Sequence, residues 1–266
     1  MINVNGAALA YDDTGAGSPV VLVHAGIADR RMWREQIGPL AAHHRVVTLD
    51  LRGYGDSDLP TGTFAQHDDV AGLLDALGIE RAALVGCSVG GAVAIDVALA
   101  HPHRVSALVL LGTTVSGHEW SDETNDLWEK VIGDVDAGDL DATAAADVRF
   151  WVVGPDRQPT DVDPALLDFA REMDRRTLAA EATADNFAML RLDPPAIGRL
   201  GEIRVPVLVG AGAADVPDIS RLADQIAAEV PVATRLPDVP DAGHLLPLER
   251  PASVNDALLT FLASAN

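Results

Sequence analysis

Ser88 stands in the segment Gly86-Cys87-Ser88-Val89-Gly90-Gly91, which carries the strongest chemical signal in the sequence. An apolar stretch of strand length precedes this segment and a helical pattern follows it, which is the context of a nucleophile elbow. Such a sharp strand-to-helix turn strains the backbone of the serine and leaves no room for side chains at Gly86 and Gly90. We therefore expect the Ser88 hydroxyl to stand above the strand ends as a nucleophile.

A serine hydroxyl attacks only with the help of a general base, and eight histidines are available for that role. His24 ends a predicted strand and suits a supporting role in a loop, whereas His118 could at most line a pocket. His244 lies in the loop 241–251, after the last predicted strand and before the last predicted helix. The sequence therefore favours His244 as the base.

A carboxylate must fix the tautomer of this histidine and balance its positive charge during the reaction. In the fold that a nucleophile elbow implies, the chain order is serine, then acid, then histidine. Asp215 fits that order because it closely follows the predicted strand 205–209. Asp218 is the alternative acid, and it would also cap the next helix. We prefer Asp215, and the sequence leaves Asp218 open.

Acyl transfer also needs hydrogen-bond donors for the oxyanion. The backbone amide of Val89, directly after the nucleophile, is one predicted donor. The second is expected from the loop His24-Ala25-Gly26-Ile27. Gly26 is preferred because a backbone that approaches a substrate closely favours glycine, and Ile27 is the alternative. With such donors the reaction needs no metal ion or other cofactor, and none is expected.

Short apolar runs alternate with helical patterns in both end regions of the chain. Continuous apolar runs of strand length are typical of strands buried on both faces of a parallel sheet. A hairpin is expected at the N-terminus, with Asn5-Gly6 as its type I′ turn. The alternation predicts a doubly wound, mostly parallel α/β sheet. The expected strands are 2–4, 8–11, 19–23, 45–49, 82–85, 105–111, 205–209 and 233–236, and the expected helices are 33–40, 69–77, 90–100, 219–229 and 253–262.

The alternation stops between residues 113 and 200. The simplest architecture is a core domain formed by residues 1–112 and 201–266, with residues 113–200 as a helical insertion, called the cap below. Helical patterns in the inserted segment cover 122–132, 140–151 and 164–190, and a strand is suggested only by the short run 149–153.

Composition excludes several classes of protein. The chain has 266 residues, 48% of them hydrophobic, which excludes a disordered chain despite a formal net charge of −21. Such an acidic surface repels phosphate backbones, so no nucleic-acid partner is expected. We see no apolar run long enough for a membrane span and no secretory leader, and the single cysteine excludes an internal disulfide. We expect a cytoplasmic monomer or homodimer that acts on a small molecule.

Five elements stand in an order that is jointly specific: His24-Ala25-Gly26, Asp50–Ser57, Gly86–Gly91, Asp215–Pro217, and Gly243-His244 with Glu249–Pro251. From about residue 19 to 262 the chain resembles the α/β-hydrolase superfamily, and looks most like its serine-dependent esterases, 3-oxoadipate enol-lactonases and cofactor-free haloperoxidases. The resemblance implies that Ser88, Asp215 and His244 form a triad beneath a lid. A serine at the elbow argues against the dehalogenase and epoxide-hydrolase branches, which attack with a carboxylate.

Two loops depart from the pattern of this superfamily. The first reads His-Ala-Gly where His-Gly-x is usual, which blurs the choice between Gly26 and Ile27 as the second oxyanion donor. The second, Gly210–Asp215, looks two residues longer than the common form, which keeps Asp218 as an alternative acid.

Substrate specificity is expected to reside in the cap segment, where the resemblance is weakest. Trp151 is the expected substrate contact there, and Ile27 is expected to contact the substrate from the oxyanion loop. The expected activity is hydrolysis of a small or medium-sized carboxylic ester or lactone. A C–C bond hydrolase or a perhydrolase would use the same triad. A ligand-binding receptor with vestigial turnover is the alternative from a different class of protein.

Overall fold

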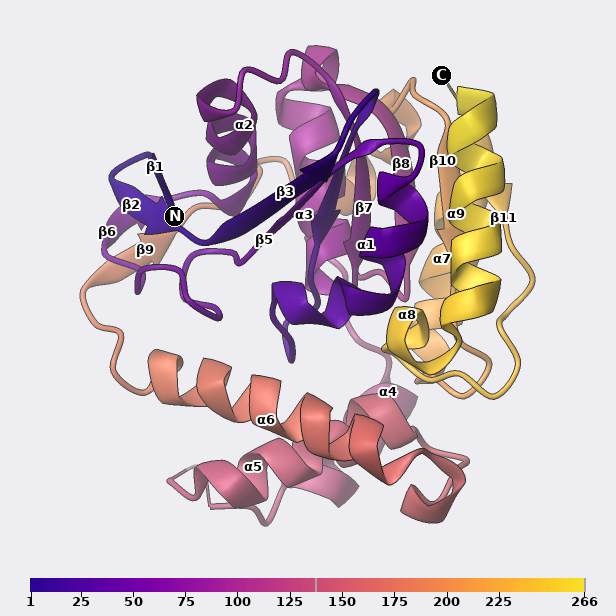
Figure 1. The fold of residues 1–266 in the computed structure, drawn as a ribbon. Helices are drawn as coiled ribbons and strands as arrows, with labels where there is room; N and C mark the ends of the chain where they lie inside the picture. The colour runs from indigo at the N-terminus through magenta and orange to yellow at the C-terminus, as the bar shows by residue number, and fades with distance from the viewer. Residues whose placement is uncertain (137, 266) are drawn as a thin grey trace.

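The computed structural model describes residues 1–136 and 138–265. Ala137, in the predicted cap, and Asn266, at the end of the predicted core, lie outside the described residues. Among the described residues, seven strands form the central sheet in the order β11-β10-β8-β7-β4-β5-β3, and all of them run parallel except β3 (Figure 1). The strands are β3 (Tyr11–Gly15), β4 (Pro19–Val23), β5 (Arg45–Leu49), β7 (Ala82–Cys87), β8 (Val105–Leu111), β10 (Val207–Gly210) and β11 (Ala233–Arg235).

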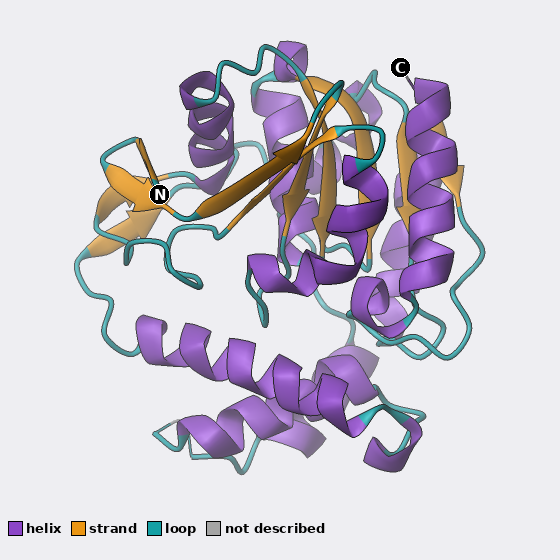
Figure 2. Cartoon of the chain, viewed as in Figure 1, coloured by secondary structure: helices purple, strands orange, loops and turns teal. Residues whose placement is uncertain are grey.

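Helices cover both faces of this sheet because its strands are apolar on both sides. In β4, Val20 and Leu22 belong to the core on one side, whereas Val21 and Val23 belong to the core on the other. Figure 2 shows the resulting layers of helix, sheet and helix. The predicted doubly wound, mostly parallel fold is therefore confirmed. One side carries α1 (Arg34–Ala41) and α9 (Pro251–Ala265), and the other carries α2 (Gln66–Ala76), α3 (Val89–Ala100) and α7 (Pro217–Glu229).

The predicted N-terminal hairpin is present. β1 (Ile2–Val4) pairs with β2 (Ala7–Leu9) in antiparallel register. Asn5 and Gly6 have φ angles of 48° and 80°, and a type I′ turn requires positive φ at both of its central residues. The hairpin forms a small sheet of its own beside the central one.

The sequence did not reveal most of β3. We expected a single strand over 8–11, but the structure has β2 end at Leu9 and a new strand begin at Tyr11. β3 is an edge strand, and its residues Asp12 and Asp13 are exposed. An edge strand that faces solvent has no apolar pattern from which it could be predicted.

Three helices form a layer at one end of the molecule, apart from the helices that cover the sheet (Figure 1). These cap helices are α4 (Asp122–Ile132), α5 (Leu140–Asp147) and α6 (Pro164–Glu181). All three lie within residues 113–200, the segment predicted as the cap. That these residues form a unit separate from the core stays a prediction. In the part of the chain that the structure describes, no helix combines the length and apolarity that a bilayer crossing requires.

A π-helical turn follows the second cap helix. We expected one helix over 140–151, but α5 ends at Asp147 and continues as a π-helical turn, Val148–Val153. The strand suggested over 149–153 is therefore not formed. This apolar run is short enough to suit a strand or a buried helical turn, and periodicity alone does not distinguish them.

The third cap helix is shorter than predicted. We expected it to reach residue 190, but α6 ends at Glu181, and Asn186 has a φ angle of 53° that no helix accommodates. The following residues form β9 (Phe187–Met189), which pairs in parallel with β6 (Gly62–Phe64). This small sheet ties the chain after α6 to the loop before α2.

Candidate active site

The turn between β7 and α3 has the strained geometry that the sequence predicts. Ser88 has φ 54° and ψ −120°, a backbone conformation that residues other than glycine rarely adopt. A Cβ atom at Gly86 would lie 2.3 Å from the carbonyl oxygen of Gly90, and one at Gly90 would lie 2.2 Å from that of Val23. Glycine is therefore the only residue that fits at these two positions without displacing the backbone.

Ser88, His244 and Asp215 lie together at this turn. The Nε2 atom of His244 is 2.6 Å from the Ser88 Oγ, and its Nδ1 atom is 2.8 Å from the Asp215 Oδ2. The three residues are 6%, 1% and 8% exposed, respectively. Because a carboxylate only accepts hydrogen bonds, Nδ1 carries the proton in the neutral ring, and Nε2 is left to accept the proton of the serine hydroxyl.

Asp218, the alternative acid, faces other partners. Its carboxylate accepts a hydrogen bond of 2.7 Å from the Ser121 backbone amide and one of 2.9 Å from Arg221. Burial alone would raise the pKa of Asp218, but the hydrogen bonds from Ser121 and Arg221 outweigh burial and lower that pKa. Asp218 does not cap α7 either, since the N-cap residue is Val216. It connects α7 to the start of α4.

The predicted oxyanion donors are neighbours. Val89 is the first residue of α3, so its amide has no acceptor within the helix. A Cβ atom at Gly26 would lie 3.1 Å from a methyl carbon of Val89, which shows how closely the loop after β4 approaches the helix. Neither Gly26 nor Ile27 donates its amide proton to any of the described residues. The choice between these two amides stays a prediction.

His24 supports the oxyanion loop. Its Nε2 atom accepts a hydrogen bond of 3.0 Å from the Leu51 amide, so its Nδ1 atom carries the proton and donates it to the Ala25 carbonyl at 2.8 Å. The ring is fully buried, and this burial lowers the pKa of His24. The neutral ring therefore connects the loop after β4 to the loop after β5, the supporting role expected from the sequence.

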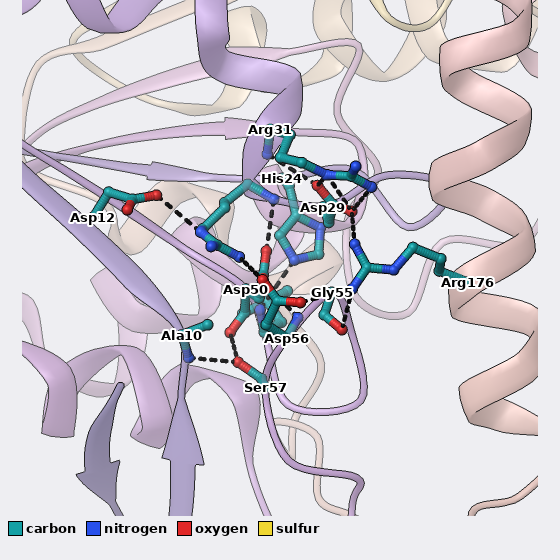
Figure 3. Close-up of polar contacts among 12 residues, drawn as sticks. Ala10, Asp12, His24, Asp29, Arg31, Asp50, Gly55, Asp56, Ser57 and Arg176 are labelled. Atoms are coloured by element: carbon teal, nitrogen blue, oxygen red, sulfur yellow. Dashed lines mark hydrogen bonds and ion pairs between the residues drawn. The ribbon is translucent and has the colours of Figure 1, made fainter.

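The same two loops bind the third cap helix (Figure 3). Arg176 of α6 donates a hydrogen bond of 2.7 Å to Asp56 and lies 3.7 Å from Asp29. A second contact has its arginine in the core and its carboxylate in the cap. Arg31 donates to Asp29 at 2.7 Å and to Glu172 of α6 at 3.0 Å. The oxyanion loop is thus joined to the cap by paired charges, which the sequence could not reveal because the partners are distant in the chain.

Trp151 lies against the candidate base. The centroids of the Trp151 and His244 rings are 4.5 Å apart with an interplanar angle of 34°, and the Trp151 carbonyl accepts the His244 amide proton at 3.1 Å. Phe150, Trp120 and Trp128 surround the indole. The residue expected to contact substrate therefore lies directly beside the site, on the π-helical turn after α5. Ile27 is half-buried in the oxyanion loop.

Arg157 and Glu249 hold the loop that carries His244. Glu249 accepts a hydrogen bond of 2.9 Å from the Gly243 amide and one of 2.8 Å from Arg157, which also donates to the carbonyls of Val153 and Asp241. Glu249 belongs to Glu249–Pro251, one of the segments in which the chain resembles the superfamily. Nothing in the sequence near Arg157 indicates its role, since its partner lies 92 residues away.

Within residues 1–136 and 138–265, no group of three or more histidine, cysteine, aspartate or glutamate side chains is placed to hold a metal ion. The residues around Ser88 join a hydroxyl, an imidazole and a carboxylate through hydrogen bonds, and the two oxyanion amides stay predicted. Such an arrangement is able to attack a carbonyl carbon and stabilise the resulting oxyanion.

The chain is similar to known proteins over most of its length. The family described as "alpha/beta hydrolase fold" matches residues 18–251. A Mycobacterium tuberculosis protein named as a candidate non-heme bromoperoxidase is 32% identical over 96% of this chain and 98% of its own length. The structure of a thermophilic esterase from Thermogutta terrifontis has a TM-score of 0.76 and is 28% identical, covering 99% of this chain and 97% of the esterase.

A further relative matches only in part. The 2-hydroxy-6-oxo-2,4-heptadienoate hydrolase of Pseudomonas putida is 37% identical over 137 residues, which are 48% of this chain. The match spans about half of that relative, 49% of its length.

Proposed function

Because the chain belongs to the α/β-hydrolase family, we propose that it hydrolyses a small or medium-sized carboxylic ester or lactone through an acyl-enzyme on Ser88. The observation that carries this proposal is the continuous hydrogen-bonded series from Ser88 through His244 to Asp215, with distances of 2.6 and 2.8 Å. The similarity to the esterase from Thermogutta terrifontis, which extends over nearly the whole chain, supports the choice of ester bonds.

The proposed reaction has two halves. The Ser88 Oγ attacks the ester carbonyl while His244 Nε2 takes the hydroxyl proton, and Asp215 stabilises the imidazolium that forms. The amides of Val89 and Gly26 donate to the oxyanion. When the tetrahedral intermediate collapses, His244 gives its proton to the leaving alkoxide. A water molecule then attacks the acyl-enzyme by the same steps and releases the acid.

Two side chains are proposed to position the substrate. Trp151 offers an apolar indole beside His244, where the leaving group must lie in order to receive the proton from Nε2. Ile27 is half-buried next to the proposed oxyanion donor and offers an apolar contact to the other side of the carbonyl. The high negative charge of the chain disfavours polyanionic substrates.

A covalent label tests the nucleophile. An organophosphonate should modify Ser88, identified by peptide mass spectrometry, and Ser88→Ala should lower kcat for p-nitrophenyl esters by about 10⁴. Ser264→Ala is the matched control, since this serine lies in α9, away from the candidate site, and donates to the Phe261 carbonyl. Ester turnover that persists in Ser88→Ala, or a label on another residue of an active enzyme, would show that the proposal is wrong.

A C–C bond hydrolase is the second candidate, favoured by the partial match to the heptadienoate hydrolase. It would use the same three residues. The two activities are separated by a panel of esters, lactones and vinylogous diketones, in which the preferred substrate has the highest kcat/KM. A receptor of the same fold would instead release one equivalent of p-nitrophenol and then stop, whereas the proposed enzyme turns over many times.

A further inference from the structure

A cavity of about 220 Å³ follows one face of α3, starting at Val89, the residue after Ser88. Val89, Ala92, Val93 and Asp96 line it from that helix. These positions are spaced by three, four and seven residues, so their side chains point to the same side of the helix. Seven residues of an α-helix advance by about 10 Å. The cavity therefore leads from the proposed oxyanion donor, Val89, to a carboxylate about 10 Å away.

The cavity has both apolar and polar residues in its lining. Val89, Val93 and Val115 give apolar surface, and Tyr54 and Thr114 add polar groups near the Val89 end. Asp96, Ser116 and His67 give polar surface at the other end. A substrate chain that reaches the far end of this space meets polar groups there.

Asp96 has an unused hydrogen-bonding atom at the polar end. The residue is 7% exposed, and its Oδ2 accepts a hydrogen bond of 2.7 Å from the Ser116 hydroxyl. Its Oδ1 is buried and has no hydrogen-bond partner among the described residues. Leaving a buried acceptor without a donor destabilises a protein, and the effect is larger for a charged group. A ligand that donates a hydrogen bond to this Oδ1 atom relieves the destabilisation.

The cavity suits the acyl side of a substrate better than its leaving group. The leaving oxygen must lie near His244 Nε2 in order to take its proton. Neither His244 nor Trp151 lines this cavity, which instead touches Val89, the residue whose amide is proposed to bind the carbonyl oxygen. A chain that enters the cavity therefore extends from the acyl carbon.

We propose that Asp96 selects esters whose acyl chain ends in a hydrogen-bond donor, either a hydroxyl or an ammonium group. The proposal rests on the ester-hydrolase function proposed above. An extended chain advances about 3.5 Å for every three bonds, so roughly six to nine bonds separate the carbonyl from the donor. A chain that ends in a carboxylate is disfavoured, because it would approach a second buried carboxylate. Arg191 also lines the cavity, but its side chain is exposed to solvent, so it offsets this repulsion less than a buried cation would.

Matched p-nitrophenyl esters test this proposal. The ω-hydroxyoctanoate and ω-aminooctanoate esters carry the two donors, and the nonanoate ester replaces the donor by a methyl group on a chain of the same length. We expect kcat/KM to be about tenfold or more higher for each donor ester than for the nonanoate ester, since hydrogen bonds to charged groups are worth that factor or more. The carboxylate-ended ester should be the poorest substrate.

Two substitutions separate the sources of this preference. Asp96→Leu removes the acceptor, so both donor esters should fall to the level of the nonanoate ester. Asp96→Asn keeps a neutral acceptor, so the preference for the hydroxyl ester should persist while that for the ammonium ester is lost. Asp174→Asn is the control for loss of a buried carboxyl group, since Asp174 lies in α6 and does not line the cavity. It should keep both preferences.

The outcomes distinguish this inference from the function on which it rests. If wild-type protein hydrolyses the nonanoate ester and the donor esters equally well, the assignment of Asp96 is wrong while the esterase function stands. If no ester is hydrolysed and Ser88 is not labelled by an organophosphonate, the proposed function itself fails. Should Asp96→Leu not fold, the wild-type ratios and Asp96→Asn decide the matter.

Discussion

Asp215 and Asp218 lie three residues apart, yet their carboxylates face different partners. Asp215 accepts from His244, whereas Asp218 accepts from Ser121 and Arg221. Spacing along the chain could not separate the two, because both follow the same strand and precede the same helix. The structure separates them because Asp215 lies at the turn before α7 and Asp218 lies within its first turn. Their substitution should therefore have different effects.

We predict that Asp215→Asn lowers kcat by about 10³ to 10⁴, since an amide holds the wrong tautomer of His244. Asp218→Asn should leave kcat within a factor of a few and lower the free energy of unfolding by about 1 to 2 kcal/mol, because it weakens hydrogen bonds to the carboxylate. Steady-state kinetics and urea unfolding of both variants measure the two effects. The opposite pattern of rates would mean that the acid is misassigned.

Residue types and their order along the chain were enough to predict Ser88 and His244 as a set, whereas the oxyanion role of residues 24–27 stays a prediction. The elbow has a local signature, since its glycines are fixed by steric contacts within the turn. The side chains that hold this set in place have no such signature. Arg157 and Glu249 depend on contacts between segments that meet only after folding.

At the scale of elements, prediction depended on how deeply each element is buried. The bounds of β4, β5 and β8 agree with their apolar runs because these strands are covered on both faces. β3 was not foreseen in full because its side chains face solvent. The end of α6 at Glu181 was misjudged because no proline or glycine follows it before Asn186.

Two carboxyl groups are buried between the cap helices α5 and α6. Burial raises the pKa of Asp147, and burial together with the charge of Asp147 raises the pKa of Asp174 to about 8. Glu181, on the same helix, adds to this effect. An unfolded aspartate titrates near 3.9. Asp174 is therefore protonated in the folded protein at neutral pH, where it is ionised in the unfolded chain.

This difference makes the stability of the protein depend on pH. Between about pH 4 and pH 8 the folded state binds this proton more tightly than the unfolded chain does. The contribution of Asp174 to the free energy of unfolding is therefore fully present below about pH 4 and is lost as the pH rises through 8. Asp174→Asn mimics the protonated group. We predict that the stability gained by this variant over the wild type grows by roughly 3 to 4 kcal/mol from pH 5 to pH 8.

Urea unfolding at several pH values measures this trend. Asp168→Asn is the control, because Asp168 lies on the same helix but is exposed to solvent and pairs with Arg171. Its stability relative to the wild type should not change with pH in the same way. A constant difference between Asp174→Asn and the wild type would show that Asp174 is ionised in the folded protein.

At the scale of the whole molecule, the cap is fastened to the core by charges and by strand pairing. Arg176 and Arg31 join α6 to the loops around the oxyanion site. β9 joins the chain after α6 to β6. The sequence indicated that a helical insertion exists, but it gave no sign of these attachments, since they connect residues more than 100 positions apart.

We predict that Arg176→Gln loosens α6. Ion pairs that are partly exposed contribute about 0.2 to 1 kcal/mol each, so hydrogen exchange in the C-terminal half of α6 should accelerate a few-fold. Arg175→Gln is the matched control, because Arg175 pairs with Asp141 within the cap and not with the core. Exchange monitored by mass spectrometry compares the two variants, and equal rates in both would mean that the contacts of Arg176 do not hold the helix.

The stacking of Trp151 on His244 gives the protein an internal optical probe. A protonated imidazole in contact with an indole quenches its fluorescence, whereas a neutral imidazole does so much less. Any event that charges His244 or displaces it from the indole should therefore alter the emission of Trp151. Covalent modification of Ser88 should thus become visible as a change in intrinsic fluorescence that is absent in Trp151→Phe. Each step of turnover could then be followed in stopped flow with unlabelled protein and colourless substrates.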